Sequence, residues 1–446
     1  MLKISFKNFI RSKSLLLGLL FLLIAGGIGL FTGGRFLQKQ RENIEKTTHS
    51  QEESIKRNVQ FVNKEMGLLL YYLRFALVNE TPNLTALSIG QRDVNPSIQS
   101  VTIRNLEAQK YDTDLVNPMQ LLLGNLDFGF VLIYLFPLII IALSYNLISE
   151  EKEEGTWALV LSQTGSATKM LGQKFSIRFS SILAVYVALI LTAFFSLQLP
   201  FDSAFLGIVA IGFSYLSFWF SISWLVISFQ KHSSFNAQIL LAAWVLLTVV
   251  APAMVNNWVI NTYPTPEAIA TTVAQRDGYH RKWDTDKNAT MTAFYSHYPQ
   301  FRAFSLPDKT FNWLWYYAMQ QMGDDDAQHE AAELTEKLTR REQVSNQIAA
   351  FIPTLHIQLK MNALCQSSMA NHVQFLDSLT RFHEQKRLFF YPKIFADAPV
   401  LAENWDVFKV EYFKENRRVD WLSLLLPLAI YTLILSGWAW VNLRKI

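Results

Sequence analysis

Six stretches of the chain contain no Asp, Glu, Lys or Arg, and all of them are rich in apolar residues. They cover residues 14–34, 128–149, 179–201, 203–230, 232–266 and 421–443. A helix needs about 20 apolar residues to cross the hydrocarbon core of a bilayer, because each residue rises about 1.5 Å. The pattern therefore predicts six transmembrane helices at residues 14–34, 128–149, 179–200, 204–228, 237–258 and 421–443.

The polar remainder includes two long insertions, residues 35–127 and 259–420. In residues 52–76, apolar side chains are spaced alternately by four and three, which is typical of a helix that packs on one face. Residues 35–46 are polar and contain no proline, so we expect the first membrane helix to continue outward as a stalk. Pro82, Gly90 and Pro96 indicate a loop within residues 81–100.

The second insertion contains two further helix signals. One runs from Asp324, at an acidic N-terminus, to about Phe351. The other covers residues 373–382, and Pro392 and Pro399 are expected to interrupt the chain after it. No segment alternates strongly enough between apolar and polar residues to predict a sheet. The expected fold class is an all-α integral membrane protein with a mainly helical extracytoplasmic domain built from the two insertions.

Composition excludes several classes of protein. The 446 residues are 51% hydrophobic and 17% charged, against about 25% charged in ordinary soluble proteins. A soluble globular enzyme, a fibrous protein and a disordered chain are therefore excluded. Cys365 is the single cysteine, so the chain forms no intrachain disulfide and no cysteine-based metal site. The net charge of +4 is too small to indicate a nucleic-acid partner.

Charge also predicts the orientation. Segments 1–13, 150–178, 231–232 and 444–446 together hold 11 basic and 4 acidic residues, whereas residues 267–420 hold 18 basic and 20 acidic ones. Because short cytoplasmic segments carry the excess of positive charge, we expect both termini to be cytoplasmic and both insertions to lie outside. The first apolar stretch exceeds the core of a signal peptide, about 7–15 residues, so we expect an uncleaved anchor. No charged residue lies inside a predicted span, which disfavours a transporter driven by a coupling ion.

Motifs for common catalytic and nucleotide sites are absent from the sequence. It contains no G-x-x-x-x-G-K-[ST], so the chain has no P-loop of its own, and no G-x-S-x-G nucleophile motif. The run from His329 to Glu333 ends in Glu where a zinc motif needs a second histidine, which favours a solvated helix face. The aromatic run from Trp313 to Tyr317 is interpreted as a domain core or interfacial belt rather than a contact for a hydrophobic substrate. We expect no catalytic residue, metal or cofactor in this chain.

Residues 1–13 have the pattern of a basic amphipathic helix. Lys3, Lys7 and Arg11 recur every four residues, and apolar side chains share another face. Such a helix lies in the headgroup plane of the bilayer as an elbow before the first span. Ordinary positive flanking of a membrane helix is the alternative interpretation.

The predicted cytoplasmic loop 150–178 is the second candidate site. An acidic segment ends at a glycine, a helix breaker, and a short apolar segment follows before Ser166, which is suited to cap a new helix. A short helix held between two spans is suited to receive force from a soluble partner. A solvated charged loop is the alternative. The residues expected to form the contact are Glu150, Glu151, Glu153, Glu154, Gly155 and Thr156.

This loop resembles that of the ABC-2 type transporter permeases. The resemblance rests on a Glu-x-Glu-x-Gly-Thr motif, an apolar stretch, a small-residue turn and a Gly-x-Lys before the third span. These positions are Glu151, Glu153, Gly155, Thr156, Leu159, Leu161, Ser162, Gly165, Gly172 and Lys174. Family members usually have a proline after the apolar stretch, where this chain has Gln163 and Thr164. Large outer domains after the first and fifth spans are similar to a subgroup with a domain of unknown function, and to gliding-motility and nitrous-oxide-maturation permeases.

The resemblance implies a permease subunit in a bacterial inner membrane. Such permeases work as homo- or heterodimers, so a second copy or a paralogue is expected, and each binds a separate ABC ATPase subunit that holds ATP and Mg²⁺. ATP binding would push the loop helix and the elbow, where Lys7 and Arg11 lie. Export is the usual direction, but force transmission to an envelope protein is also open. The chief rival is a non-transporting sensor or scaffold whose outer domain binds an envelope partner; an intramembrane hydrolase is a weaker third possibility.

Overall fold

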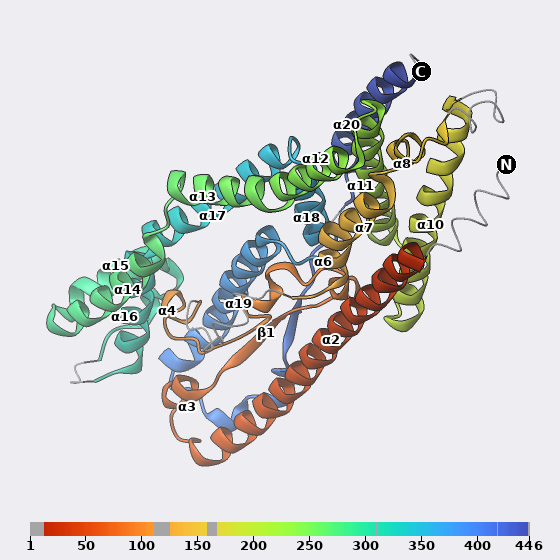
Figure 1. Cartoon of the computed structure of the whole chain (residues 1–446). Helices are drawn as coiled ribbons and strands as arrows, with labels where there is room; N and C mark the ends of the chain where they lie inside the picture. Colours follow the sequence, from red (N-terminus) through yellow and green to blue (C-terminus); the bar gives the residue numbers. More distant parts are fainter. Residues whose placement is uncertain (1–12, 111–124, 158–166, 308–310, 417, 445–446) are drawn as a thin grey trace.

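The computed structural model describes residues 13–110, 125–157, 167–307, 311–416 and 418–444, which are mainly helical (Figure 1). Six helices in these ranges are long and apolar enough to cross a membrane. This finding fits a multi-pass membrane protein and agrees with the six predicted spans. The candidate spans are Leu15–Phe61, Phe128–Glu153, Met170–Ser196, Ser203–Ser228, Ser233–Thr262 and Trp421–Leu443.

The six spans pack into a bundle with one continuous apolar core. Its elements are α2 (Lys13–Phe61), α6 and α7 (Phe128–Phe130 and Phe136–Ser144), α10 (Ala167–Ser196), α11 (Ser203–Ser228), α12 and α13 (Ser233–Val245 and Ala251–Thr262) and α20 (Trp421–Leu443). The core of the bundle centres on α11, where Tyr215 and Trp219 are fully buried. Helix α10 begins at Ala167, directly after Ser166, where the sequence predicts the start of a new helix, so the latter part of the loop 150–178 is helical.

Two of the spans contain a wide helical turn beside a proline. π-Helical turns cover Val131–Leu135 and Leu246–Val250, and Pro137 and Pro252 follow them closely. Proline lacks the N–H that a helix needs, so carbonyls in the preceding turn require other donors. The Tyr215 hydroxyl donates to the carbonyl of Ile133 at 2.9 Å, and the Thr354 hydroxyl donates to that of Leu247. These prolines therefore shape the packing of helices through side-chain donors on neighbouring elements.

The first span continues beyond the bundle, as the polar segment after it predicts. Helix α2 is unbroken to Phe61 and runs along one side of the molecule to its far end, where α3 (Met66–Tyr72) lies (Figure 1). The predicted helix 52–76 is therefore broken between these two elements. The break folds α3 back so that Leu69 and Leu70 share an apolar core with Ile55 of α2.

The two insertions fold together into one unit, which we call the helical domain. From the second insertion it contains α14 (Glu267–Asp284), α15 (Lys287–His297), α16 (Trp313–Asp326), α17 (Gln328–Ala349), α18 (Pro353–Leu364) and α19 (Met369–Phe395). The first insertion adds α3 and α4 (Glu107–Lys110). The helix predicted from Asp324 to about Phe351 forms as α17 but begins at Gln328. Asp324 lies in the last turn of α16, where its buried carboxylate accepts from the amides of Leu106 and Glu107 and from Arg387. Pro392 lies inside α19 and does not end it.

A small sheet corrects the expectation of an all-α fold. Strand β1 (Phe75–Asn79) pairs antiparallel with β2 (Ile98–Val101) and parallel with β3 (Glu411–Phe413), in the order β2-β1-β3. Every residue of β1 is buried, so this strand shows no alternation of apolar and polar residues. The sheet joins the first insertion to the end of the second one, which makes the helical domain a single body at the junction with the bundle.

Candidate functional site at the end of the second span

The predicted acidic helix forms where the second span ends. Helix α8 (Ser149–Glu153) follows α7 after a short turn and stops before Gly155. Gly155 has φ +72°, a left-handed backbone conformation that favours glycine, and a Cβ atom built there would meet nothing within 4 Å. The helix stop predicted at this glycine is confirmed, and its cause is backbone conformation rather than crowding. We call α8, the turn to Trp157 and the facing residues 230–236 the corner.

One carboxylate of α8 binds the third span. Glu151 accepts a hydrogen bond from Lys174 of α10 at 2.5 Å and another from the Thr156 hydroxyl at 2.6 Å. Lys174 and Glu151 are both partly exposed, with 24% and 20% of their side chains accessible. This arrangement closes the turn after α8 and fixes it to the second turn of α10.

A second carboxylate of α8 binds the fifth span. Glu153 accepts from both the backbone amide and the hydroxyl of Ser233, each at 2.8 Å. Ser233 is the first residue of α12, so the carboxylate satisfies an amide that has no partner within the helix and opposes the positive end of the helix dipole. Ser149 and Ser233 share a further hydrogen bond of 2.7 Å, and Lys152 donates to Gln230 at 2.7 Å.

The residues directly before α8 are apolar and buried, and most of α8 itself faces solvent. Leu147 and Ile148 pack in a small cluster with residues from α10, α11 and α20, namely Met170, Leu171, Ile227 and Leu443. Glu154 and Gly155 are exposed, and Glu150 accepts from Asn146 at 3.0 Å. A force on the exposed acidic side would therefore act on a helix whose preceding turn packs against the ends of several spans.

The structure gathers Glu150, Glu151, Glu153, Glu154, Gly155 and Thr156 at this corner. Lys7 and Arg11 of the predicted elbow, and residues 158–166 of the predicted loop, lie outside the described residues. Sequence reasoning missed Ser233 and Gln230 as partners of α8. These two residues stand about 80 positions away, and a serine before an apolar run is a common helix start that carries no sign of its acceptor.

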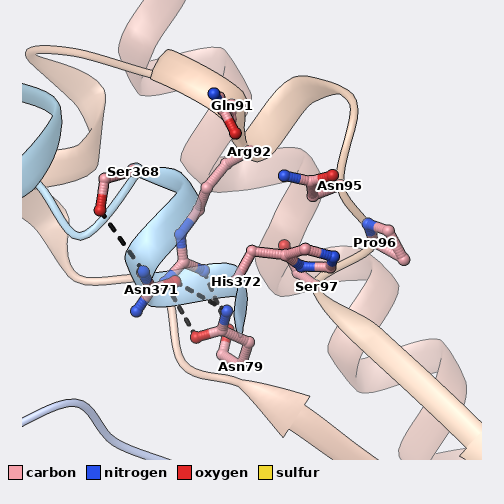
Figure 2. Close-up of a pocket in the computed structure, with 9 residues that line it drawn as sticks. All are labelled: Asn79, Gln91, Arg92, Asn95, Pro96, Ser97, Ser368, Asn371 and His372. Atoms are coloured by element: carbon pink, nitrogen blue, oxygen red, sulfur yellow. Dashed lines mark hydrogen bonds between the residues drawn. The ribbon is translucent and has the colours of Figure 1, made fainter. Parts of the chain in front are cut away.

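At the other end of the bundle, a small polar pocket lies between the two insertions (Figure 2). Its cavity of about 10 Å³ has room for a single water molecule. Gln91 Oε1 and His372 Nδ1 are buried without a partner in the described part of the chain, which fits an ordered water. Burial, and then the charge of Arg92, lower the pKa of His372 to about 4. The pocket is too small for a substrate, and it lies in the interface where the two insertions pack against each other.

Two sequence motifs, the aromatic run 313–317 and the run 329–333, lie in the helical domain. Trp315, Tyr316 and Tyr317 are buried in the aromatic core of the helical domain, which confirms the interpretation as a core. His329 and Glu333 form an exposed i,i+4 pair at 3.1 Å on α17, as expected for a solvated helix face. Within the described residues, no cluster of three or more His, Cys, Asp or Glu side chains is placed to hold a metal ion.

One family model matches the chain. It is described as a domain of unknown function, DUF3526, and it covers residues 268–412. The matched region begins in α14 and ends in β3, so it comprises most of the second insertion. No curated protein matches the chain, and no solved structure does. The match and the six apolar helices together fit a membrane protein.

Proposed function

We propose that this chain is the permease subunit of an ABC-2 type ATP-driven transporter, most simply an exporter of a bacterial inner membrane. The observation that carries the proposal is the double attachment of α8. Glu151 ties this helix to α10 and Glu153 ties it to α12, so a displacement of α8 moves the starts of the third and fifth spans together. That is the property required of a helix that receives force from an ATPase.

The rest of the chain is compatible with a division of labour between subunits. The sequence contains no P-loop, so ATP and Mg²⁺ would bind a separate ATPase subunit. In this proposal the corner and both termini are cytoplasmic, and the helical domain is outside. Only 11% of the most apolar window of the fifth span is buried in the described structure, which leaves its sides to lipid and to a second permease copy or a paralogue.

A non-transporting sensor or scaffold is the second candidate. The observation in its favour is the helical domain, whose aromatic core makes it a substantial folded unit beyond what a membrane path needs. In that case an envelope protein would bind the domain, and no ATPase would bind the corner. The same domain would serve a transporter if the bundle transmits force to an envelope partner.

Co-purification of the full-length chain in detergent separates these candidates. We expect an ATPase with a P-loop to co-purify in a fixed ratio and to hydrolyse ATP. Reversing the charges of Glu150, Glu151, Glu153 and Glu154 should release it or uncouple its activity while the protein stays folded. A matched control reverses four exposed glutamates of the stalk, Glu42, Glu45, Glu52 and Glu53. Recovery of a stable wild-type protein without an ATPase would contradict the proposal.

A further inference from the structure

A buried segment joins the bundle to the helical domain. Residues 82–93, which we call the strap, connect β1 to the chain before β2 and contain two 3₁₀ turns, Asn83–Ala86 and Gly90–Asp93. Leu84 and Leu87 belong to the apolar core of the bundle. The carbonyl of Ala86 lies so close to Gly33 of α2 that a Cβ atom there would stand 2.0 Å from it. The strap is therefore packed directly against the first span.

The second span holds the strap through one aspartate. Asp127 caps the start of α6 by accepting from the amide of Phe130 at 2.8 Å, and its other oxygen accepts from the amide of Ile89 at 2.8 Å. The carbonyl of Leu87 accepts in turn from the amide of Gly129 at 2.8 Å. Asp127 is 7% exposed, so these hydrogen bonds form away from solvent. The first turn of the span and the middle of the strap thus share their backbone hydrogen bonds.

The far end of the strap is bound to the helical domain by an arginine (Figure 2). The Arg92 guanidinium donates to the backbone carbonyls of Asn79, Glu80 and Gln366. It also donates to the side-chain oxygens of Asn79, at 3.0 Å, and Asn371, at 3.2 Å. Asn79 ends β1 and Asn371 lies in the first turn of α19, so a single side chain connects both insertions.

A third set of hydrogen bonds runs from the strap to the last turn of α18 and the segment after it. Thr85 donates to the carbonyl of Cys365 at 2.8 Å, and Ser88 donates to Asn362 Oδ1 at 2.7 Å. Ser367 donates back to the carbonyl of Ser88 at 2.8 Å. Helix α18 itself packs on α11 and α20, as its core residues Ile357 and Met361 show. The strap is therefore held from three sides by elements far apart in the sequence.

These contacts place the corner and the strap at the two ends of one span. Helix α8 stands at one end of the candidate span Phe128–Glu153, and Asp127 directly precedes the other. We propose that the strap is the rigid link through which a displacement of the second span reaches the helical domain. The inference rests on the proposed function, because that function supplies the displacement. The path runs from α8 along the span to Asp127, through Ile89 to Arg92, and from there into β1 and α19.

The matched test compares two aspartates that cap membrane helices at the same end of the bundle. Asp202 caps α11 by accepting from Phe205 at 2.9 Å, but it is exposed and makes no hydrogen bond to the strap within the described structure. Full-length Asp127→Ala and Asp202→Ala are compared by hydrogen exchange of the peptide covering residues 84–93. Loss of a charged acceptor should raise exchange there about tenfold to a hundredfold in Asp127→Ala and leave it unchanged in Asp202→Ala. Unchanged protection in Asp127→Ala would overturn the proposed tie.

The transmission is tested in the complex with its ATPase. Addition of a non-hydrolysable ATP analogue should change exchange in α19 in the wild type and in Asp202→Ala, but not in Asp127→Ala. A response of α19 that persists in Asp127→Ala would overturn the link. Absence of any response in the wild type would contradict the proposed function, while the exchange comparison without nucleotide still decides whether Asp127 holds the strap. Should Asp127→Ala fail to fold, Asp127→Asn keeps the side-chain volume and one acceptor, and a smaller increase of the same sign is expected.

Discussion

At one end of the second candidate span, Glu151 and Glu153 bond to neighbouring helices from positions that solvent reaches. At the other end, Asp127 and the strap are buried, and their partners are mostly backbone amides and carbonyls. Hydrogen bonds between accessible side chains cost little to break and re-form, because water replaces the lost partner. Buried backbone groups have no such replacement, so their contacts persist or the region unfolds.

The difference assigns different tasks to the two ends. The corner, with its exposed acidic side and its glycine turn, is suited to meet a partner and to adjust to it. The strap is suited to carry a displacement without yielding. Substitutions at the buried end should therefore cost more stability than substitutions at the accessible end.

Removal of Arg92 should have the largest effect on stability. Arg92→Ala removes the donor to the buried carbonyl of Asn79 and to the partly buried carbonyl of Gln366, and the loss of a donor to a buried carbonyl is costly. We expect a loss of about 3 kcal/mol or more, measured by thermal unfolding in detergent. Arg41→Ala is the control, because Arg41 also bonds to the strap, through Asn83 at 2.8 Å, but on the exposed side. An equal effect of the two substitutions would contradict the buried character of the strap.

Acidification should weaken the same region through His372. Its folded pKa of about 4 lies below the ordinary value of 6.5, so the unfolded state takes up a proton first as the pH falls. The contribution of the neutral imidazole is complete above pH 6.5 and declines toward pH 4. His372→Asn should therefore flatten the decrease of the unfolding temperature between pH 7 and pH 5, by an amount equivalent to about 1–3 kcal/mol. Parallel pH profiles of the two proteins would contradict this assignment.

The glycine turn of the corner should respond to backbone conformation alone. Gly155→Ala places a Cβ atom on a left-handed residue and should cost about 1 kcal/mol, whereas Gly155→Asn should cost less because asparagine tolerates this conformation. Gly155→Pro cannot adopt a positive φ, so we expect it to uncouple ATP hydrolysis while the bundle stays folded. The checks are the unfolding temperature and the ATPase rate of the complex. Normal coupling in Gly155→Pro would contradict the role of the turn.

The accessible ion pair of the corner should have the smallest effect on stability. Lys174→Ala removes a partly exposed partner of Glu151 and should cost less than about 1 kcal/mol. The substitution should nevertheless weaken the coupling of ATP hydrolysis to movement of the bundle, because α8 then loses its attachment to α10. Lys414→Ala, which removes an exposed pair with Glu80 in the helical domain, should be equally mild in stability and without effect on coupling. Indistinguishable coupling in the two variants would contradict the proposed path into α10.

The two ends also differ in how far the sequence predicts them. The helix stop at Gly155 and the acidic helix before it follow from local residue preferences, so both were accessible from the sequence. Pro82 and Gly90 predict a loop in the strap, and its short 3₁₀ turns agree with that prediction. Its burial could not be predicted, because Asn362 and Gln366, which bind Ser88 and Arg92, lie more than 270 positions further along the chain.

The sheet and the end of α16 eluded sequence reasoning for a related reason. Strand β1 is buried on both faces, and its parallel partner β3 is only three residues long and far away in the sequence. The acidic run at Asp324 is typical of a helix start, but it forms the last turn of α16, where Arg387 and the amides of Leu106 and Glu107 bind the Asp324 carboxylate. Tertiary contacts outweigh local preference at such positions.

Hydrogen exchange of the starts of α10 and α12, in the complex with its ATPase, tests the central claim most directly. Binding of a non-hydrolysable ATP analogue should change exchange at both helix starts in the wild type. In Glu151→Ala/Glu153→Ala the change should be confined to α8, because both attachments are lost. An equal response of α10 and α12 in this double variant, or no response of α8 in the wild type, would contradict the account.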